Sequence, residues 1–328
     1  VQMSAFHFAE LSPDLILDAL ASVGLYLESG LTPLNSYENR VYQFLAEDRR
    51  RYVAKFYRPQ RWSCEQILEE HRLALFLSEN DVNVATPLVF NGATLHHHQG
   101  FLFAVWPSVG GRHVEPDNLE QLEMVGHQLG LWHSLSSAMP LAARGCYSHQ
   151  RFVAEPVASL IQSAPWPNAL SGNFPSLLRT LSAMLQPLLA QPVAQIPIHG
   201  DCHIGNILWR DGPMLVDLDD CLMGPAIQDL WMLLSGDEAE QRLQLDALLA
   251  GYEEFCEFDL TQLRLIEPLR AARMIHHLAW LDRRWNDPAF PKAFPWFHDD
   301  SFWLTQHQQL TEQLTRLKAP PLSLTPYH

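Results

Sequence analysis

The segment 199–206 constrains this chain more than any other, because it gathers several polar side chains around a glycine-containing turn. It reads His-Gly-Asp-Cys-His-Ile-Gly-Asn and is followed by two short apolar runs and then by Asp217. The residues between the apolar runs, 210–213, read Arg-Asp-Gly-Pro, which is typical of a hairpin turn. The sequence therefore predicts a β-hairpin with Asp201 and Asn206 before its first strand and Asp217 after its second.

Polar residues at both ends of an apolar hairpin indicate a catalytic site. Asn206 and Asp217 carry the hard oxygen ligands that Mg²⁺ prefers, so we expect them to be metal ligands. Asp201 lies five residues before Asn206, and this spacing matches the catalytic-loop aspartate that orients and deprotonates a hydroxyl in kinases. Each of these residues alone could simply satisfy a loop backbone. Their joint spacing favours phosphoryl transfer, with Asp201 and Asp217 as the catalytic residues.

The pattern HGDxHxxN, followed by an apolar run and an aspartate, resembles the signature of the aminoglycoside phosphotransferase and choline kinase-like branch of the protein-kinase-like superfamily. Two further segments resemble parts of that family. Segment 125–133 ends in Trp-His, and segment 224–230 reads Gly-Pro-x-x-x-Asp. Segments 34–42 and 230–234 resemble the bacterial stress response kinase A group. The resemblance implies a cytoplasmic serine/threonine protein kinase of a bacterial stress response, with ATP as co-substrate and Mg²⁺ as cofactor.

The length of 328 residues and the change of pattern along the chain predict two lobes. The resemblance implies a bilobal α+β fold of the protein-kinase type. We expect a nucleotide-binding lobe at 1–106, with a small antiparallel sheet and one main helix, and a mainly helical catalytic and acceptor-binding lobe at 107–328. In the first lobe, the apolar patterns predict a helix at 12–24, strands within 31–58, a helix at 64–77, and strands at 85–90 and 100–106 separated by a turn that contains three histidines.

Lysine is rare in this chain, which has only Lys55, Lys292 and Lys318 among 22 basic residues. Under the resemblance, Lys55 falls at the end of the third strand, where the kinase fold places its phosphate-binding lysine. A carboxylate on the next helix should hold it, and of the adjacent Glu69 and Glu70 we expect Glu70. The alternative is a solvated lysine on an edge strand.

The turn expected to cover the phosphates, 35–40, contains no glycine, unlike the glycine-rich loop of protein kinases. We predict that the Ser36 hydroxyl contacts a phosphate, although a simple turn-forming role is also open. The adenine should lie against residues 106–109. Asp219 could assist a second Mg²⁺ or structure its loop, and Asp229 is expected to anchor the catalytic loop.

The formal net charge of −15 argues against a nucleic-acid partner, because such proteins neutralise phosphates with a basic face. Residues 40–61 nevertheless hold seven basic and two acidic residues, a local excess that could receive nucleotide phosphates. The acidic stretch 237–259 could bind a cationic acceptor or form a solvated helix face. Five scattered cysteines and the lack of a long apolar run predict a cytoplasmic monomer that does not bind membranes.

These observations predict an ATP-dependent kinase, and the resemblance alone implies that its acceptor is a serine or threonine of a protein, including the chain itself. Only eleven residues separate Asp217 from Asp229, which argues against a regulatory activation loop. Two alternatives remain open. One is a small-molecule kinase with an aminoglycoside, choline or homoserine-like acceptor, and the other is a nucleotide-binding pseudokinase.

Overall fold

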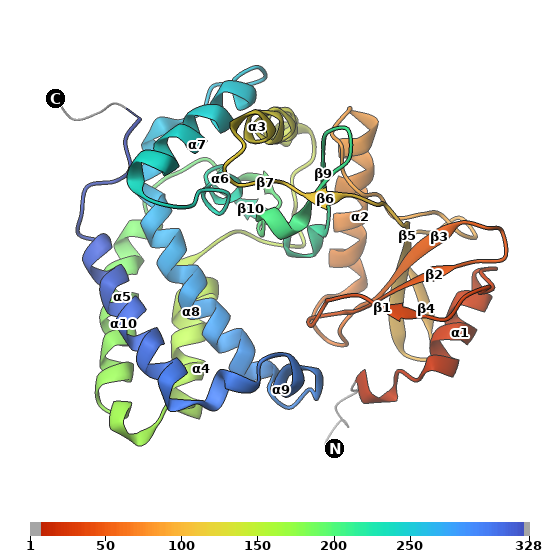
Figure 1. The fold of residues 1–328 in the computed structure, drawn as a ribbon, viewed down its shortest axis with the longest axis horizontal. Coiled ribbons are helices and arrows are strands. Elements are labelled where there is room, and N and C mark those ends of the chain that lie inside the picture. The colour runs from red at the N-terminus through yellow and green to blue at the C-terminus, as the bar shows by residue number, and fades with distance from the viewer. Residues whose placement is uncertain (1–7, 325–328) are drawn as a thin grey trace.

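The computed structural model describes residues 8–324, which form two lobes joined along one side (Figure 1). The smaller lobe contains an antiparallel sheet of five strands in the order β1-β2-β3-β5-β4. Its strands are β1 (Thr32–Pro33), β2 (Arg40–Leu45), β3 (Arg51–Phe56), β4 (His96–His98) and β5 (Phe101–Pro107).

Two helices accompany this sheet. Helix α1 (Pro13–Ser22) packs its apolar side chains against one face of the sheet, and α2 (Cys64–Glu79) lies between the sheet and the larger lobe (Figure 1). The Ser12 hydroxyl caps α1 by accepting a hydrogen bond from the backbone of Leu15. Ser63 and Gln66 form a reciprocal capping box at the start of α2. Both helices therefore begin where the sequence predicts.

The predicted strand at 85–90 is wrong. This segment contains Pro87, which has no amide hydrogen to donate, and it has no strand assignment. The histidine segment predicted as a turn is instead strand β4, which pairs with β5. The turn directly follows β4, at Gln99 and Gly100. The φ angles of these residues, 44° and 89°, suit a two-residue hairpin loop.

The larger lobe is mainly helical. Its helices are α3 (Leu119–Ser134), α4 (Glu155–Ser163), α5 (Asn173–Leu189), α6 (Gln228–Trp231), α7 (Glu238–Tyr252), α8 (Ile266–Arg284), α9 (Ala289–Ala293) and α10 (Asp300–Arg316). Two small sheets lie among them, formed by β6 (Arg112–His113), β8 (Ile207–Trp209), β9 (Pro213–Leu215) and by β7 (Ile196–Ile198), β10 (Leu222–Gly224).

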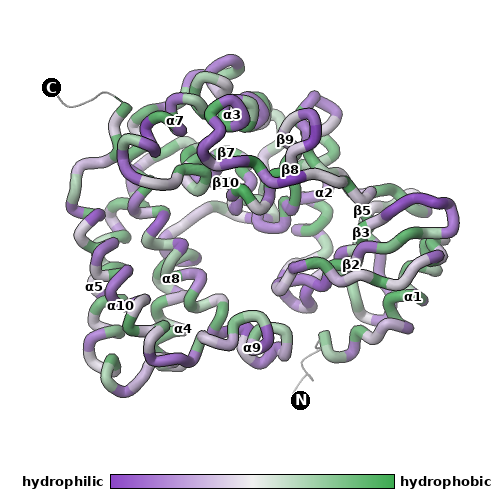
Figure 2. Tube along the Cα trace, in the orientation of Figure 1, coloured by the Kyte–Doolittle hydropathy of each residue, from purple (hydrophilic) through white to green (hydrophobic). Residues whose placement is uncertain are grey.

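Separate apolar cores support the two sides of the larger lobe. One core joins α3, α6 and α7 to the hairpin β8–β9 and to the buried face of α2. The other joins α4, α5, α8 and α10. Figure 2 shows apolar residues recurring along these helices, as amphipathic packing requires. The hairpin β8–β9 is thus held rigidly beside the small lobe.

The structure confirms the predicted bilobal α+β fold. Strand β5 extends to Pro107, and β6 begins at Arg112 in the other lobe. The division into 1–106 and 107–328 stays a prediction, and its outer ends, 1–7 and 325–328, lie outside the described residues. Within residues 8–324, no helix is both long enough and apolar enough to cross a membrane.

Candidate active site

The predicted hairpin exists and brings three of the predicted site residues together. The segment 199–206 connects β7 to β8, and Asp217 follows β9. The Asn206 side-chain amide donates to the carbonyl oxygen of Asp201 at 3.0 Å. The backbone N–H of Val216 donates to the carbonyl oxygen of Asn206 at 3.0 Å, which holds Asp217 beside the loop.

The turn at Gly200 requires glycine. Its φ of 85° lies in the left-handed region, and a Cβ atom there would lie 2.3 Å from the carbonyl oxygen of Asp220. The two polypeptide segments therefore approach closely at this point. This contact brings the loop that follows Asp217 against the loop that carries Asp201.

Buried polar contacts fix the backbone of the catalytic loop. The fully buried carboxylate of Asp229 accepts hydrogen bonds from the backbone N–H groups of His199 at 2.8 Å and Gly200 at 3.0 Å. His133 contacts the same carboxylate at 3.0 Å. The His199 side chain donates through Nε2 to the carbonyl oxygen of Val216 at 2.9 Å. These contacts agree with the expected anchoring role of Asp229 and the structural role of His199.

The carboxylate of Asp201 carries donors on both oxygens. Arg273 of α8 donates to Oδ1, and Nε2 of His203 lies 3.3 Å from Oδ2. Burial raises the pKa of Asp201, but the hydrogen bond from His203 and the charge of Arg273 outweigh burial, so its pKa lies below the ordinary value. Asp201 is therefore ionised and can accept a hydrogen bond from an approaching hydroxyl once one of its donors moves aside.

Lys55 projects from β3 into the space in front of Asp217. Its Nζ lies 2.8 Å from Oδ1 of Asp217 and 5.1 Å from the ring centre of Trp106. Burial lowers the pKa of Lys55, but Asp217, Asp219 and Glu70 raise it more, so the net pKa is above the ordinary value and the ammonium stays charged. The structure thus places a buried cation next to one predicted metal ligand.

In this structure Lys55 and Glu70 lie near each other but make their direct contacts with other residues, and the role predicted for Glu70 stays a prediction. Glu70 is buried on α2 and accepts a hydrogen bond from Arg144 at 2.8 Å, whereas Lys55 donates to Asp217. Arg144 is itself buried and also donates to the carbonyl oxygen of Asp219 at 2.5 Å. A guanidinium can bind several oxygens in a fixed fork, so Arg144 contacts both the Glu70 carboxylate and the backbone of Asp219.

The neighbouring Glu69 is equally structural. Its carboxylate accepts hydrogen bonds from three successive backbone N–H groups, those of Ala142, Ala143 and Arg144, at 2.7–3.1 Å. It therefore fixes the segment that presents Arg144. Glu69 and Glu70 of α2 therefore both bind the same loop of the larger lobe.

Ser36 lies in the turn between β1 and β2, and this turn contacts the larger lobe. Glu38 accepts hydrogen bonds from Arg284 at 2.8 Å and from the indole of Trp280. Asn39 donates to Asp219 at 3.1 Å. The predicted phosphate contact of Ser36 stays a prediction, and the structure adds that its turn is tied to α8.

The basic residues of the small lobe are mostly neutralised by acids. Arg40 and Arg58 both bind Asp287 of the larger lobe, at 2.7 Å and 2.8 Å, and Arg61 binds Asp219 and Asp220. Three of these arginines form ion pairs across the two lobes, as Lys55 does with Asp217, and the expectation that this local excess of charge receives the nucleotide phosphates stays a prediction. Among these basic residues, Lys55 is the one that contacts the predicted metal ligand Asp217.

The residues at the hairpin fit a magnesium ion. The side-chain nitrogen of Asn206 is used by Asp201, which leaves its amide oxygen as a ligand, and the Asp217 carboxylate is half exposed. In addition, Oδ1 of the buried Asp219 has no hydrogen-bond partner among the described residues. Asn206 and Asp217, with Asp219 behind them, provide the hard oxygens that Mg²⁺ requires. Within residues 8–324, no group of three or more His, Cys, Asp or Glu residues forms a metal site of its own.

Sequence reasoning missed several residues that shape the site, namely Asn39, Arg61, Arg144, His203 as a partner of Asp201, and Arg273. Arg273 lies 72 positions beyond Asp201, and Arg144 lies 74 beyond Glu70, so no local spacing connects them. Only the packing of α8 and of the segment before α4 brings them to the site.

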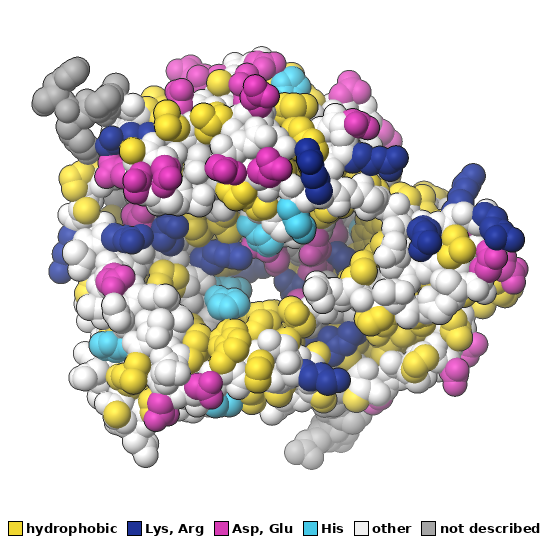
Figure 3. Space-filling view, in the orientation of Figure 1, with side chains coloured by type: hydrophobic (Ala, Val, Ile, Leu, Met, Phe, Trp, Pro, Cys, Tyr) yellow, Lys and Arg dark blue, Asp and Glu magenta, His cyan; other side chains and the backbone are white. Residues whose placement is uncertain are grey.

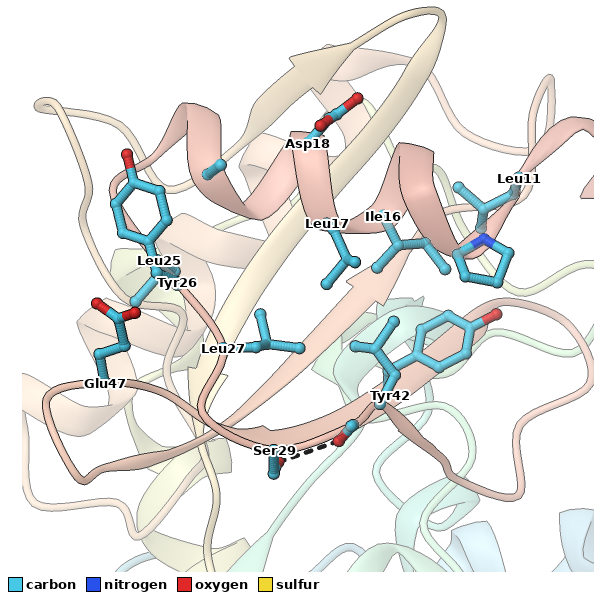
Figure 4. A pocket seen from close by; sticks show the side chains of 14 residues that line it. Leu11, Ile16, Leu17, Asp18, Leu25, Tyr26, Leu27, Ser29, Tyr42 and Glu47 are labelled. Carbon is cyan, nitrogen blue, oxygen red and sulfur yellow. Dashed lines mark hydrogen bonds between the residues drawn. The ribbon is translucent and has the colours of Figure 1, made fainter.

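A hollow of about 760 Å³ lies away from these residues, between α1, the segment 25–31 and strand β2 (Figure 4). Mostly apolar side chains line it, such as Leu17 and Leu27. It contains none of the predicted site residues. The polar constellation around Asp201 therefore remains the candidate active site.

The comparisons with known proteins agree with this geometry. Residues 30–266 match the family described as APH, phosphotransferase enzyme family. The chain belongs to this phosphotransferase family. It is 53% identical over 325 residues to stress response kinase A of Escherichia coli K12, with 99% of each chain covered. It is 51% identical, again with 99% of each chain covered, to a Salmonella typhimurium protein named serine/threonine protein kinase RdoA.

Solved structures of other phosphotransferases share the fold. An amicoumacin kinase solved with AMP-PNP and Ca²⁺ has a TM-score of 0.73 and 21% identity, with 96% of this chain and 95% of that chain covered. A microcompartment-associated aminopropanol kinase has a TM-score of 0.70 and 17% identity, with 96% and 100% covered. The predicted family resemblance is confirmed, and this phosphotransferase is a kinase for which the family implies ATP as co-substrate.

Proposed function

We propose that this phosphotransferase is a Mg²⁺-dependent kinase that transfers the γ-phosphoryl group of ATP to a serine or threonine hydroxyl of a protein. The observation that carries the proposal is the grouping of Asp201, Asn206, Asp217 and Lys55 at one end of the β8–β9 hairpin. The relative named a serine/threonine protein kinase supports the protein acceptor.

In the proposed reaction, the acceptor oxygen attacks the γ-phosphorus while the bond to the β,γ-bridging oxygen breaks and ADP leaves. Asp201 orients the hydroxyl and accepts its proton. Lys55 binds phosphate oxygens as a compact cation, and Ser36 donates a hydrogen bond to a phosphate. Bound to Asn206 and Asp217, Mg²⁺ would offset charge on the phosphate oxygens.

Substitution of Asp201 by asparagine tests this assignment. Asparagine keeps the side-chain shape but cannot take the proton, so kcat for transfer from radiolabelled ATP should fall by about 10²-fold or more. ATP affinity should change by less than threefold, because Asp201 is not placed on the nucleotide. Asp211→Asn is the matched control, since Asp211 is an exposed aspartate in the turn of the same hairpin. Equal turnover by wild type and the Asp201 variant would contradict the proposal.

A small-molecule acceptor is the second candidate, because the solved proteins of similar fold include an amicoumacin kinase and an aminopropanol kinase. Parallel assays with unstructured proteins and with small amino alcohols separate the two. A pseudokinase would show no turnover that depends on Asp201. The cytoplasmic location and the monomeric state stay predictions.

A further inference from the structure

The acceptor must reach Asp201, so the surfaces around Asp201 select it. One wall is the face of α8 that carries Arg273, His276 and His277, spaced so that they lie on one side of the helix. A second wall is the π-helical turn Gln150–Ala154, which packs against α8. Its Phe152 ring lies 5.3 Å from the ring of His276.

Basic side chains dominate these walls. The guanidinium of Arg151 lies over the Phe152 ring, with its carbon 5.3 Å from the ring centre, and donates to the carbonyl oxygen of Arg144 at 3.0 Å. Arg273 contacts Asp201 itself, and Arg283 follows two turns after His276 on α8. Figure 3 shows Lys, Arg and His side chains along the hollow between the lobes, beside Asp and Glu side chains.

Two of these arginines form no ion pair. Arg61 binds Asp219 and Asp220, but the structure shows no ion pair for Arg151 or Arg283 among the described residues. Burial is the main reason that their pKa values lie below the ordinary value; neighbouring arginines lower them further, and acids such as Asp220 and Glu38 offset only part of this. Because no carboxylate of the described residues is in direct contact with either guanidinium, both can bind a carboxylate of an acceptor.

The lowered pKa of His276 shows that several arginines lie near this side chain in the cleft. Burial lowers its pKa most, and the charges of Arg283, Arg273, Arg151 and Arg61 follow, which together bring its pKa to about 3. A histidine neighboured by four arginines is held neutral. A cationic acceptor would meet repulsion here, whereas an anionic one would gain charge-assisted hydrogen bonds.

The acidic stretch 237–259 does not change this balance. Most of it forms α7, which packs on α3 at the end of the larger lobe opposite α9 (Figure 1). Its acids act locally: Asp237 caps α7, Glu254 contacts His127 at 3.0 Å, and Asp259 caps the next turn. The sequence-based possibility that this stretch binds a cationic acceptor therefore has no support from its position.

We propose that the acceptor is an acidic peptide segment, a serine or threonine flanked by aspartate or glutamate, whose carboxylates bind Arg151, Arg273 and Arg283. The inference rests on the proposed protein kinase function. Arg273 is the movable part, since its side chain is 43% exposed and holds Asp201 only through one nitrogen. When an acidic residue of the acceptor binds Arg273, an oxygen of Asp201 becomes free for the hydroxyl proton.

Three peptides of equal length, each with a central serine flanked by Glu, Gln or Lys, test the proposal. Wild-type kcat/KM should rank Glu above Gln above Lys, with about a tenfold preference for Glu over Gln if one charge-assisted contact is formed. In Arg151→Gln or Arg283→Gln this ratio should fall toward one, mainly through KM for the Glu peptide. The measured quantity is the ratio of kcat/KM for the Glu peptide to kcat/KM for the Gln peptide. A general loss of activity lowers both values equally and leaves this ratio unchanged.

Arg179→Gln is the matched control, because Arg179 is exposed on α5, and its variant should keep the wild-type ratio. A preference for the Lys peptide, or a ratio unchanged in both cleft variants, would overturn the inference. So would transfer to small anionic alcohols such as glycerol phosphate without transfer to any peptide. Failure of the underlying function is distinguishable, since the wild type would then transfer phosphoryl to no peptide or protein of any charge, whereas failure of the inference alone leaves peptide transfer without a preference for the Glu peptide.

Discussion

Glu70 illustrates how the site depends on single buried charges. Its carboxylate is 2% exposed and faces Arg144, with Lys55 and two aspartates nearby. Burial raises the pKa of Glu70 to about 7, more than Lys55 and Arg144 lower it. The side chain therefore titrates near neutrality, although it sits in an ion pair.

This raised pKa predicts a pH-dependent contribution to stability. The folded protein binds the Glu70 proton more tightly than the unfolded chain, so this contribution is fully present below the ordinary glutamate pKa of 4.5 and is lost as pH rises through about 7. Replacing Glu70 by glutamine removes this pH-dependent contribution to stability. The wild-type free energy of unfolding, relative to the variant, should fall by about 1 kcal/mol per pH unit at most between pH 5 and 7.

Urea unfolding of both proteins without nucleotide, at several pH values, measures this difference. Glu79→Gln, an exposed glutamate at the end of the same helix, should unfold in parallel with the wild type at every pH. Parallel curves for Glu70→Gln as well would show that Glu70 does not titrate in this range.

Helices α3 and α7 pack so closely that their backbones touch. A Cβ atom on Gly126 would lie 1.9 Å from the carbonyl oxygen of Leu248, and one on Gly130 would lie 2.3 Å from that of Tyr252. On the facing helix, a Cβ atom on Gly251 would lie 1.9 Å from the carbonyl oxygen of Glu123. The pair carries His133 and part of the core under Asp229, so this close packing supports the catalytic loop.

Gly126→Ala should therefore destabilise the protein. Alanine favours a helix over glycine by about 1 kcal/mol, but here its methyl group would force the two backbones apart, at a cost of about 2–4 kcal/mol. The comparison is Gly172→Ala, where φ is −93° and nothing lies within 4 Å of the added Cβ. That variant should be neutral or slightly stabilised. Thermal unfolding distinguishes them, and equal melting temperatures would contradict the close packing.

At the scale of the whole molecule, ion pairs tie the two lobes together in front of the site. Asp287 binds Arg40 and Arg58, while Glu38 binds Arg284. The Asp287 side chain is 9% exposed, so these contacts are better shielded from solvent than a surface pair. They hold the turn that carries Ser36 against α8.

Asp287→Asn tests whether these pairs hold the lobes closed. Asparagine can still accept the hydrogen bond from the backbone of Ala289 but lacks the charge that binds Arg40 and Arg58. We expect a loss of about 2 kcal/mol in the free energy of unfolding and a larger radius of gyration in solution scattering without nucleotide. Glu28→Gln breaks an exposed pair with Arg49 inside the small lobe, so its effect should stay below about 1 kcal/mol with no change in size. An unchanged radius for the Asp287 variant would show that the lobes stay closed without these pairs.

The sequence by itself determined the fold class, the β8–β9 hairpin and the residues at its ends. These are local features, since the spacing between Asp201, Asn206 and Asp217 and the turn between the two strands are all encoded within 199–217. The capped starts of α1 and α2 were local as well. Where a local signal was ambiguous, as at His96–His98, the prediction failed, because pairing with β5 decided the structure.

Only the tertiary structure decided which charges meet. Lys55 forms its ion pair with Asp217, while Glu70 pairs with the buried Arg144, which comes from another segment of the chain. Arg273 reaches Asp201 from α8, and the arginines of the small lobe bind acids of the larger lobe. Electrostatic pairing depends on distance in space and on burial, and neither quantity is encoded in the spacing of residues along the chain.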